Sequence, residues 1–252
     1  MNDEMLSFQI AFVLSLLTLP LQAADLHVAV ASNFSRPMKA LAERFEQHSE
    51  HHLLLSFAST GKHYAQIRNG AGFDLLLAAD VERPALLEQQ GLVVPGSRFT
   101  YAIGRLVLWS PLADRVDADG RILDQGDFSH LAIANPRLAP YGRAAQQVLQ
   151  GRSLWQGLQK KLVRGENIGQ AYQFVKSGQV PMGFLALAQV QEPGEALAGS
   201  FWLVPAQLHA PIEQQAVLIS DQAAARELHQ FLQSAAAREI IRSYGYEIAD
   251  AQ

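Results

Sequence analysis

Two stretches decide the fold of this chain: LHVAVASNF at residues 26–34 and LLLSFASTG at residues 53–61. In each stretch a strand-like apolar run leads directly into a short polar turn, Ser32-Asn33 in the first and Ser59-Thr60 in the second. Helix-like segments follow at 35–48 and 61–69. This order of strand, turn and helix predicts an α/β fold with parallel strands and right-handed crossovers.

The alternation continues along the chain, with one interruption. Further strands are expected at 74–78, 100–109, 131–134, 162–163, 182–185, 202–204 and 216–219, and further helices at 81–90, 142–150, 168–176, 222–234 and 235–244. The turn-rich stretch at 111–126 interrupts the pattern. We therefore expect two lobes between which the chain crosses twice, with residues 24–104 and 214–252 in lobe I and residues 105–213 in lobe II.

Composition bounds the possible functions. The chain has 252 residues, of which 49% are apolar and 17% charged, as in an ordinary globular protein with a full core. Its net charge of -4 gives no support to nucleic-acid binding or to an anionic membrane surface. The sequence contains no cysteine, which excludes disulfides, thiolate metal sites and a cysteine nucleophile.

The N-terminus has the pattern of a secretory signal. A nearly continuous apolar run from Leu6 to Leu21 ends before the small residues Ala23 and Ala24. We expect a signal peptide over 1–23, cleaved after Ala23 or Ala24, and export to a bacterial periplasm. No basic residue precedes the run, and Asp3 and Glu4 are acidic, although a start at Met5 would remove these two acids. A buried N-terminal helix and a single membrane anchor are the alternatives to a signal peptide.

Four predicted turns lie where a strand ends and a helix begins. Ser32-Asn33 and Ser59-Thr60 belong to lobe I, and 135–142 and 166–169 belong to lobe II. Helix N-termini attract anions, and ligands of open α/β sheets bind at the carboxyl ends of the strands. Each turn alone is explained as a helix cap, and Tyr141 as a packed aromatic residue. Together they predict an anion site in the cleft between the lobes.

The order and spacing of several blocks resemble one family. The blocks are ASNF at 31–34, FASTG at 57–61, GAGFDL at 70–75, AD at 79–80, PGSRFTYAIG at 95–104, ANP at 134–136, APYG at 139–142, GFLA at 183–186 and YGY at 244–246. Over essentially the whole mature chain, the sequence resembles the periplasmic molybdate-binding proteins of ABC transporters. The resemblance implies a two-lobed, type II periplasmic-binding-protein fold. Each lobe would hold a mixed, mostly parallel sheet flanked by helices, with crossing strands as the hinge.

The resemblance also implies the ligand contacts. Ser32 and Ser59 would offer hydroxyl and backbone N–H groups from lobe I, and Tyr141 and Ile168 would offer backbone N–H groups from lobe II. Many family members carry a tyrosine where this chain has Ala186, so that contact is missing here. In the branch of the family that shares this pattern, the residue corresponding to Asn33 is also a contact, so we expect Asn33 to supply the missing donor.

The function implied by the resemblance is the capture of molybdate, with tungstate, and its delivery to an inner-membrane ABC permease by a monomeric protein. Neutral donors can hold a tetrahedral dianion because charge-assisted hydrogen bonds contribute roughly 1.5–3 kcal/mol each. No cofactor, no bound metal cation and no enzymatic activity are expected. The alternatives are a binding protein for sulfate or phosphate, and an exported enzyme in which His63 or Lys62 activates a serine of the cleft.

Two further sequence patterns give only weak support to a binding site. The run Ser59-Thr60-Gly61-Lys62 has part of a nucleotide-binding loop, but it lacks the leading glycine and has His63 where magnesium needs a hydroxyl. His48, His51 and His52 are close enough in sequence to share a metal ion, although solvated histidines at a helix end are the commoner case.

Overall fold

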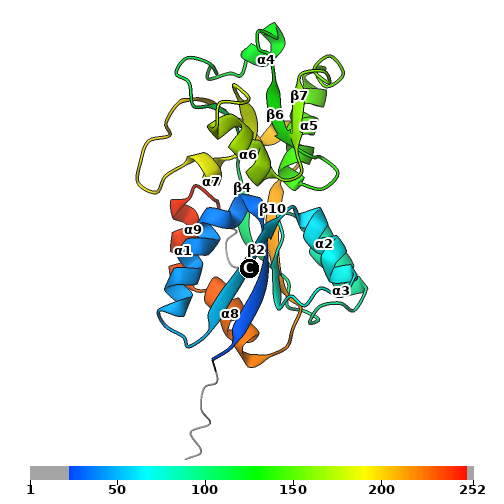
Figure 1. Cartoon of the computed structure of the whole chain (residues 1–252), viewed down its shortest axis with the longest axis vertical. Helices are drawn as coiled ribbons and strands as arrows, with labels where there is room; N and C mark the ends of the chain where they lie inside the picture. Colours follow the sequence, from blue (N-terminus) through cyan, green and yellow to red (C-terminus); the bar gives the residue numbers. More distant parts are fainter. Residues whose placement is uncertain (1–22, 249–252) are drawn as a thin grey trace, which may run out of the picture.

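Two five-stranded sheets, one in each of two lobes, carry the fold of residues 23–248, the part of the chain that this computed structural model describes (Figure 1). All but Ala23 of the predicted signal peptide lies outside the described residues. In the described part, no helix is long and apolar enough to cross a membrane.

Lobe I is the unit around the sheet with strand order β2-β1-β3-β10-β4. Its strands are β1 (Asp25–Ala31), β2 (His52–Ala58), β3 (Leu75–Leu77), β4 (Phe99–Gly104) and β10 (Ile212–Leu218). β1 runs parallel to β2 and β3, whereas β10 runs antiparallel to β3 and β4. The sheet is therefore mixed, and β10 enters it from the other lobe.

Helices cover both faces of the lobe I sheet (Figure 1). One face packs on α1 (Ser35–Glu46), α8 (Ala223–Leu232) and α9 (Ala235–Ser243), and the other on α2 (Thr60–Arg68) and α3 (Glu82–Gln89). Alternate residues of β1 enter the two cores: Val28 and Val30 join the first, and Ala29 joins the second. Burial on both faces explains why this strand is apolar from Val28 to Ala31.

Lobe II is the unit around the second sheet, ordered β7-β6-β8-β5-β9. It contains β5 (Leu106–Ser110), β6 (Leu131–Ala134), β7 (Leu162–Gly165), β8 (Gly183–Ala186) and β9 (Ser200–Leu203), with helices α4 (Ile122–Gln125), α5 (Pro140–Gly151), α6 (Ile168–Lys176) and α7 (Leu187–Val190). β6 is parallel to β7 and β8, and β5 is antiparallel to β8 and β9. In each sheet of the described chain, two parallel pairs thus stand beside two antiparallel pairs.

The chain passes between the lobes at two places. The β segment expected over 100–109 forms two strands, β4 and β5, which belong to different sheets and are separated by Arg105, next to the boundary expected between residues 104 and 105. β5 is wholly buried and β4 is half buried, so neither strand shows the strict alternation of a strand with one exposed face. The second passage lies between β9 and β10 and includes the short helix η2 (Ala206–Leu208). Figure 1 shows β4 and β10 reaching toward lobe II.

Candidate functional site

The two lobe I turns start side by side. The β1–β2 register places Ala31 opposite Ala58, so the helix η1 (Ser32–Phe34) and the helix α2 begin at the same sheet edge. Ser59 caps α2, because its Oγ accepts a hydrogen bond from the Lys62 N–H at 3.3 Å. Ser32 and Ser59 are buried. Their hydroxyls thus lie at one edge, beside the first N–H groups of both helices, of which those of Gly61 and Lys62 already have acceptors.

The lobe II turns have the same arrangement. The β6–β7 register places Ala134 opposite Gly165, and α5 and α6 begin just beyond these residues. Asn167 caps α6, with its Oδ1 accepting from the Gln170 N–H at 3.0 Å. Tyr141 follows Pro140 at the start of α5, and Ile168 is the first residue of α6. Their backbone N–H groups belong to first turns, where the helix itself provides no acceptor.

The lobe I turns contact the lobe II turns directly. The Gly169 N–H donates to the Ser32 Oγ at 3.3 Å, and the Gly61 N–H donates to the Leu138 carbonyl oxygen at 2.9 Å. The structure therefore gathers the five residues expected from the sequence at the boundary between the lobes: Ser32, Asn33, Ser59, Tyr141 and Ile168, each between 1% and 6% exposed. Such a place can hold a small anion among neutral donors, away from water.

The Asn33 side chain is already engaged within the protein. Its Nδ2 donates to the Gln214 Oε1 at 2.7 Å and to the Tyr246 hydroxyl at 3.0 Å. The Tyr246 hydroxyl in turn donates to the Asn33 carbonyl oxygen at 3.1 Å. An amide has only two N–H donors. The donor that Asn33 retains for an anion is its backbone N–H in the first turn of η1.

The missing tyrosine at Ala186 is accompanied by a buried glutamine. The Gln189 Oε1 accepts from the Ala186 N–H at 3.1 Å, and its Nε2 donates to the Ile168 carbonyl oxygen at 3.2 Å. Gln189 therefore ties the start of α7 to the start of α6. Gln189 could not be recognised from the sequence, because a single glutamine on a short helix gives no periodic signal.

A buried polar network lies beneath the turns. The Gln214 Oε1 also accepts from the Tyr101 hydroxyl at 3.0 Å, and the Gln214 Nε2 donates to the Tyr141 hydroxyl at 3.2 Å. Burial raises the pKa of Tyr101 and Tyr141 well above the ordinary value and that of Tyr246 to about 12, so all three phenols stay neutral. Tyr101 and Tyr246 lie in sequence blocks that carry the family resemblance, whereas nothing in the sequence singled out Gln214.

Ion pairs between the lobes surround the site. Lys62 of lobe I pairs with Glu166 of lobe II at 3.4 Å, and Glu82 of lobe I pairs with Arg143 of lobe II at 2.9 Å. Arg36 of lobe I pairs with Glu192 of lobe II. The hydrogen bond from Arg143 lowers the pKa of Glu82. These six charges are thus paired across the boundary between the lobes.

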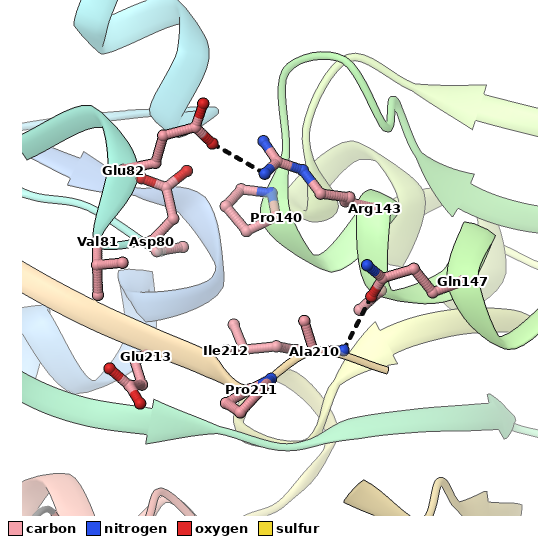
Figure 2. A pocket seen from close by; sticks show the side chains of 12 residues that line it. Asp80, Val81, Glu82, Pro140, Arg143, Gln147, Ala210, Pro211, Ile212 and Glu213 are labelled. Atoms are coloured by element: carbon pink, nitrogen blue, oxygen red, sulfur yellow. Dashed lines mark hydrogen bonds and ion pairs between the residues drawn. The ribbon is translucent and has the colours of Figure 1, made fainter. Parts of the chain in front are cut away.

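An open pocket of about 390 Å³ lies beside the site, between the lobes and the start of β10. Figure 2 shows Asp80 and Glu82 of lobe I opposite Pro140 and Arg143 of α5. Burial raises the pKa of Asp80, although Arg83 beside it acts in the opposite direction. None of the five expected site residues lines this pocket, although Pro140, which precedes Tyr141 in the chain, does.

Two alternatives from the sequence lose support. His63 is fully buried, and its ring contacts the Val30 carbonyl oxygen through Nε2 and the Gln66 side chain through Nδ1, both at 3.1 Å, so its ring nitrogens are directed away from the serines. Lys62 is committed to Glu166. His51 and His52 contact different glutamates, Glu227 and Glu46. Within residues 23–248, no group of three or more His, Cys, Asp or Glu side chains could hold a metal ion.

Comparison with known proteins identifies relatives of the whole chain. The molybdate-binding protein ModA of Azotobacter vinelandii is 47% identical over 240 residues, which are 94% of this chain and 95% of the relative. ModA of Rhodobacter capsulatus is 44% identical over 233 residues, 91% of each chain. The solved structure of the Azotobacter vinelandii periplasmic molybdate-binding protein matches with a TM-score of 0.87 at 39% identity, covering 89% of this chain and 100% of that one.

These relatives are named as binding proteins rather than enzymes, and the two-lobed fold expected from the sequence is confirmed. The sequence profile for bacterial extracellular solute-binding proteins matches residues 26–247. This chain therefore belongs to the family of bacterial extracellular solute-binding proteins, together with the ModA proteins.

Proposed function

We propose that this protein captures molybdate, and tungstate with it, between its lobes and delivers the anion to an ABC permease of the inner membrane. The observation that carries the proposal is the meeting of four strand-to-helix turns, two from each lobe, at the Ser32–Gly169 and Gly61–Leu138 contacts. The names of the relatives from Azotobacter vinelandii and Rhodobacter capsulatus supply the identity of the anion.

The proposed contacts are neutral. Ser32 and Ser59 provide hydroxyl and backbone N–H groups, Asn33 provides its backbone N–H, and Tyr141 and Ile168 provide backbone N–H groups. Helix N-termini contribute about half a positive charge each, which favours a dianion without a cationic side chain. A ring of donors also disfavours a protonated phosphate, because its O–H finds no acceptor.

The proposal includes a working cycle. Residues 1–23 direct export to the periplasm and are removed after Ala23 or Ala24. Lobe I of the monomer then comprises residues 24–104 and the chain from β10 (Ile212–Leu218) onward, with the boundary expected at 213–214 moved to the start of that strand, and lobe II comprises the residues between. The lobes close on the anion through the segments around Arg105 and between β9 and β10, and the closed form docks on the permease.

A thermal-shift series on the mature protein tests the ligand. We expect molybdate and tungstate to raise the unfolding temperature, since a ligand at about 1,000 times its Kd adds about 4 kcal/mol to the stability of the native state. Sulfate and phosphate should give little change at the same concentration. The absence of a shift with both molybdate and tungstate would refute the proposal, and an equal Kd for sulfate in titration calorimetry would make this a general oxyanion-binding protein.

A further inference from the structure

One buried side chain joins the two walls of the proposed site. Gln214 is fully buried on β10, at a bulge in the pairing of β10 with β4. Its Oε1 accepts from the Asn33 Nδ2 at 2.7 Å in lobe I, and its Nε2 donates to the Tyr141 hydroxyl, at 3.2 Å, from lobe II. We propose that Gln214 is a positioning residue for anion binding, which holds the Asn33 turn and the Tyr141 turn in register when the lobes close.

The Tyr141 side chain makes this link specific. Tyr141 belongs to α5 of lobe II, yet its hydroxyl reaches the end of β4 in lobe I, where a Cβ added to Gly104 would lie 2.0 Å from it. The absence of a side chain at Gly104 therefore leaves the room that the phenol occupies. Since the Tyr141 backbone N–H is a proposed anion donor, fixing the phenol also fixes the direction of that donor.

The Asn33 end of the link is equally constrained. Its amide is held between Gln214 and Tyr246, and the Tyr246 hydroxyl returns to the Asn33 carbonyl oxygen at 3.1 Å. These hydrogen bonds fix the orientation of the η1 turn relative to β10. A buried amide that bridges two elements specifies their relative position, because any other position leaves polar groups unpaired.

The role rests on the proposed function, and five variants test it by titration with molybdate. Gln214→Leu removes the bridge at similar volume. Gln215→Leu is the matched control: it lies next on the same strand, and its side chain contacts Arg98 and Thr100 instead. We expect Gln214→Leu to raise the Kd at least 10-fold and Gln215→Leu to change it less than twofold. Equal Kd values for the two variants would overturn the role.

Tyr141→Phe is a further test, because it preserves the backbone N–H of residue 141. It removes only the hydroxyl that Gln214 contacts, so we expect a rise in Kd of severalfold. In the double variant with Gln214→Leu, the Kd should match that of Gln214→Leu alone, because both changes break the same link. If the increases in Kd of the two single variants multiply in the double variant, the two side chains act separately, which would contradict the proposal.

Gln214→Glu gives a signature that a purely structural role does not predict. A protonated carboxyl can accept from Asn33 and Tyr101 and donate to Tyr141, as the amide does, whereas its ionised form cannot donate and repels the anion. The ratio of its Kd to the wild-type Kd should therefore fall by at least 10-fold from pH 8 to pH 5. A ratio independent of pH would contradict the proposal.

The surroundings of position 214 suit this titration. The titratable groups that face it are Tyr101, Tyr141 and Tyr246, which stay neutral over this range, with Asp80 acting from beyond Tyr101. The Kd of the wild-type protein, measured at each pH, corrects for protonation of Asp80 and of the anion itself. Wild-type protein that bound neither molybdate nor tungstate would refute the proposed function and this role with it. If the wild-type protein binds molybdate and the Gln214 variants bind it with the same Kd, the role of Gln214 is overturned and the proposed function stands.

Discussion

The backbone N–H of Gly61 in lobe I donates to the carbonyl oxygen of Leu138 in lobe II at 2.9 Å. Gly61 is the second residue of α2, and a Cβ added there would lie 3.0 Å from this oxygen and 3.1 Å from the Leu138 Cα. Both neighbours are backbone atoms, which cannot rotate away. The missing side chain at Gly61 thus allows the lobes to meet beside the site.

Gly61→Ala should weaken closure of the lobes on the anion without lowering the stability of the ligand-free protein. Alanine is favoured over glycine in helices by up to about 1 kcal/mol, so the ligand-free protein should be as stable as wild type or more stable. The closed form should be overpacked, which typically costs about 1–3 kcal/mol and corresponds to a rise in molybdate Kd of roughly 5- to 150-fold. Calorimetric unfolding and titration measure the two effects.

The control is Gly151→Ala at the end of α5, where an added Cβ meets nothing within 4 Å. It should leave the Kd unchanged. If Gly61→Ala bound molybdate as tightly as this control, the Gly61–Leu138 contact would not belong to the closed, anion-bound form.

Ser59 is both a helix cap and a proposed anion donor, whereas Ser234 is a helix cap away from the site and serves as its control. Ser59 caps α2 and Ser234 caps α9, each accepting one backbone N–H, from Lys62 and Ala237 at 3.3 and 3.2 Å. Changing either to alanine should lower the free energy of unfolding by about 1 kcal/mol. Only Ser59→Ala should weaken molybdate binding, by roughly 10- to 150-fold for one charge-assisted hydrogen bond. Urea unfolding and titration calorimetry test both, and equal Kd values would reduce Ser59 to a helix cap.

The sequence predicted the parts of this protein that repeat a local pattern. Strand, polar turn and helix recur at Ser32 and Ser59 and again before Tyr141 and Ile168, so both the fold class and the approximate places of the turns follow from periodicity and capping. The family resemblance then selected residues among many equally plausible caps. The contacts that bring these turns together, Ser32 with Gly169 and Gly61 with Leu138, join residues more than 70 positions apart.

What could not be predicted depends on packing at long range. Gln214 is a polar residue beside an apolar run, and its partners Asn33, Tyr101 and Tyr141 all come from distant positions in the sequence. By contrast, the expected lobe boundary at 104–105 falls where the run over 100–109 divides into β4 and β5. The expectation that Asn33 supplies a donor stays a prediction, and the structure narrows it to the backbone N–H, since the side chain serves Gln214 and Tyr246.

The Lys62–Glu166 pair should favour closure modestly. The two side chains are about half exposed and span the cleft at 3.4 Å. Exposed pairs contribute about 0.2–1 kcal/mol, so Glu166→Gln should raise the molybdate Kd by roughly 1.4- to 5-fold, mainly through faster dissociation, and the difference should shrink at high salt. Stopped-flow dissociation at two ionic strengths measures this. Asp119→Asn, which breaks an exposed pair with Arg121 within lobe II, is the control and should leave the dissociation rate unchanged.

Acid should destabilise the protein through a histidine behind the site. His63 is fully buried, with its Nε2 3.1 Å from the Val30 carbonyl oxygen, two residues before Ser32, and burial lowers its pKa below the ordinary value of 6.5. Below about pH 6.5 the unfolded chain therefore binds a proton that the folded protein excludes, so the stabilising contribution is complete above that pH and is lost as the pH falls toward the folded pKa. The slope for one such histidine is at most about 1.4 kcal/mol per pH unit.

His63→Gln should flatten this dependence, since the glutamine amide can still donate toward Val30 but does not titrate. His229 shares the property more weakly: it is partly buried, its Nε2 contacts the Ser97 carbonyl oxygen at 2.7 Å, and burial lowers its pKa. Urea unfolding between pH 7.5 and 5.5 should show a steeper loss of stability in wild type than in His63→Gln, with a smaller reduction in His229→Gln. Identical slopes in wild type and His63→Gln would mean that His63 becomes protonated without leaving its buried place, against the burial and hydrogen bonding that this structure gives it.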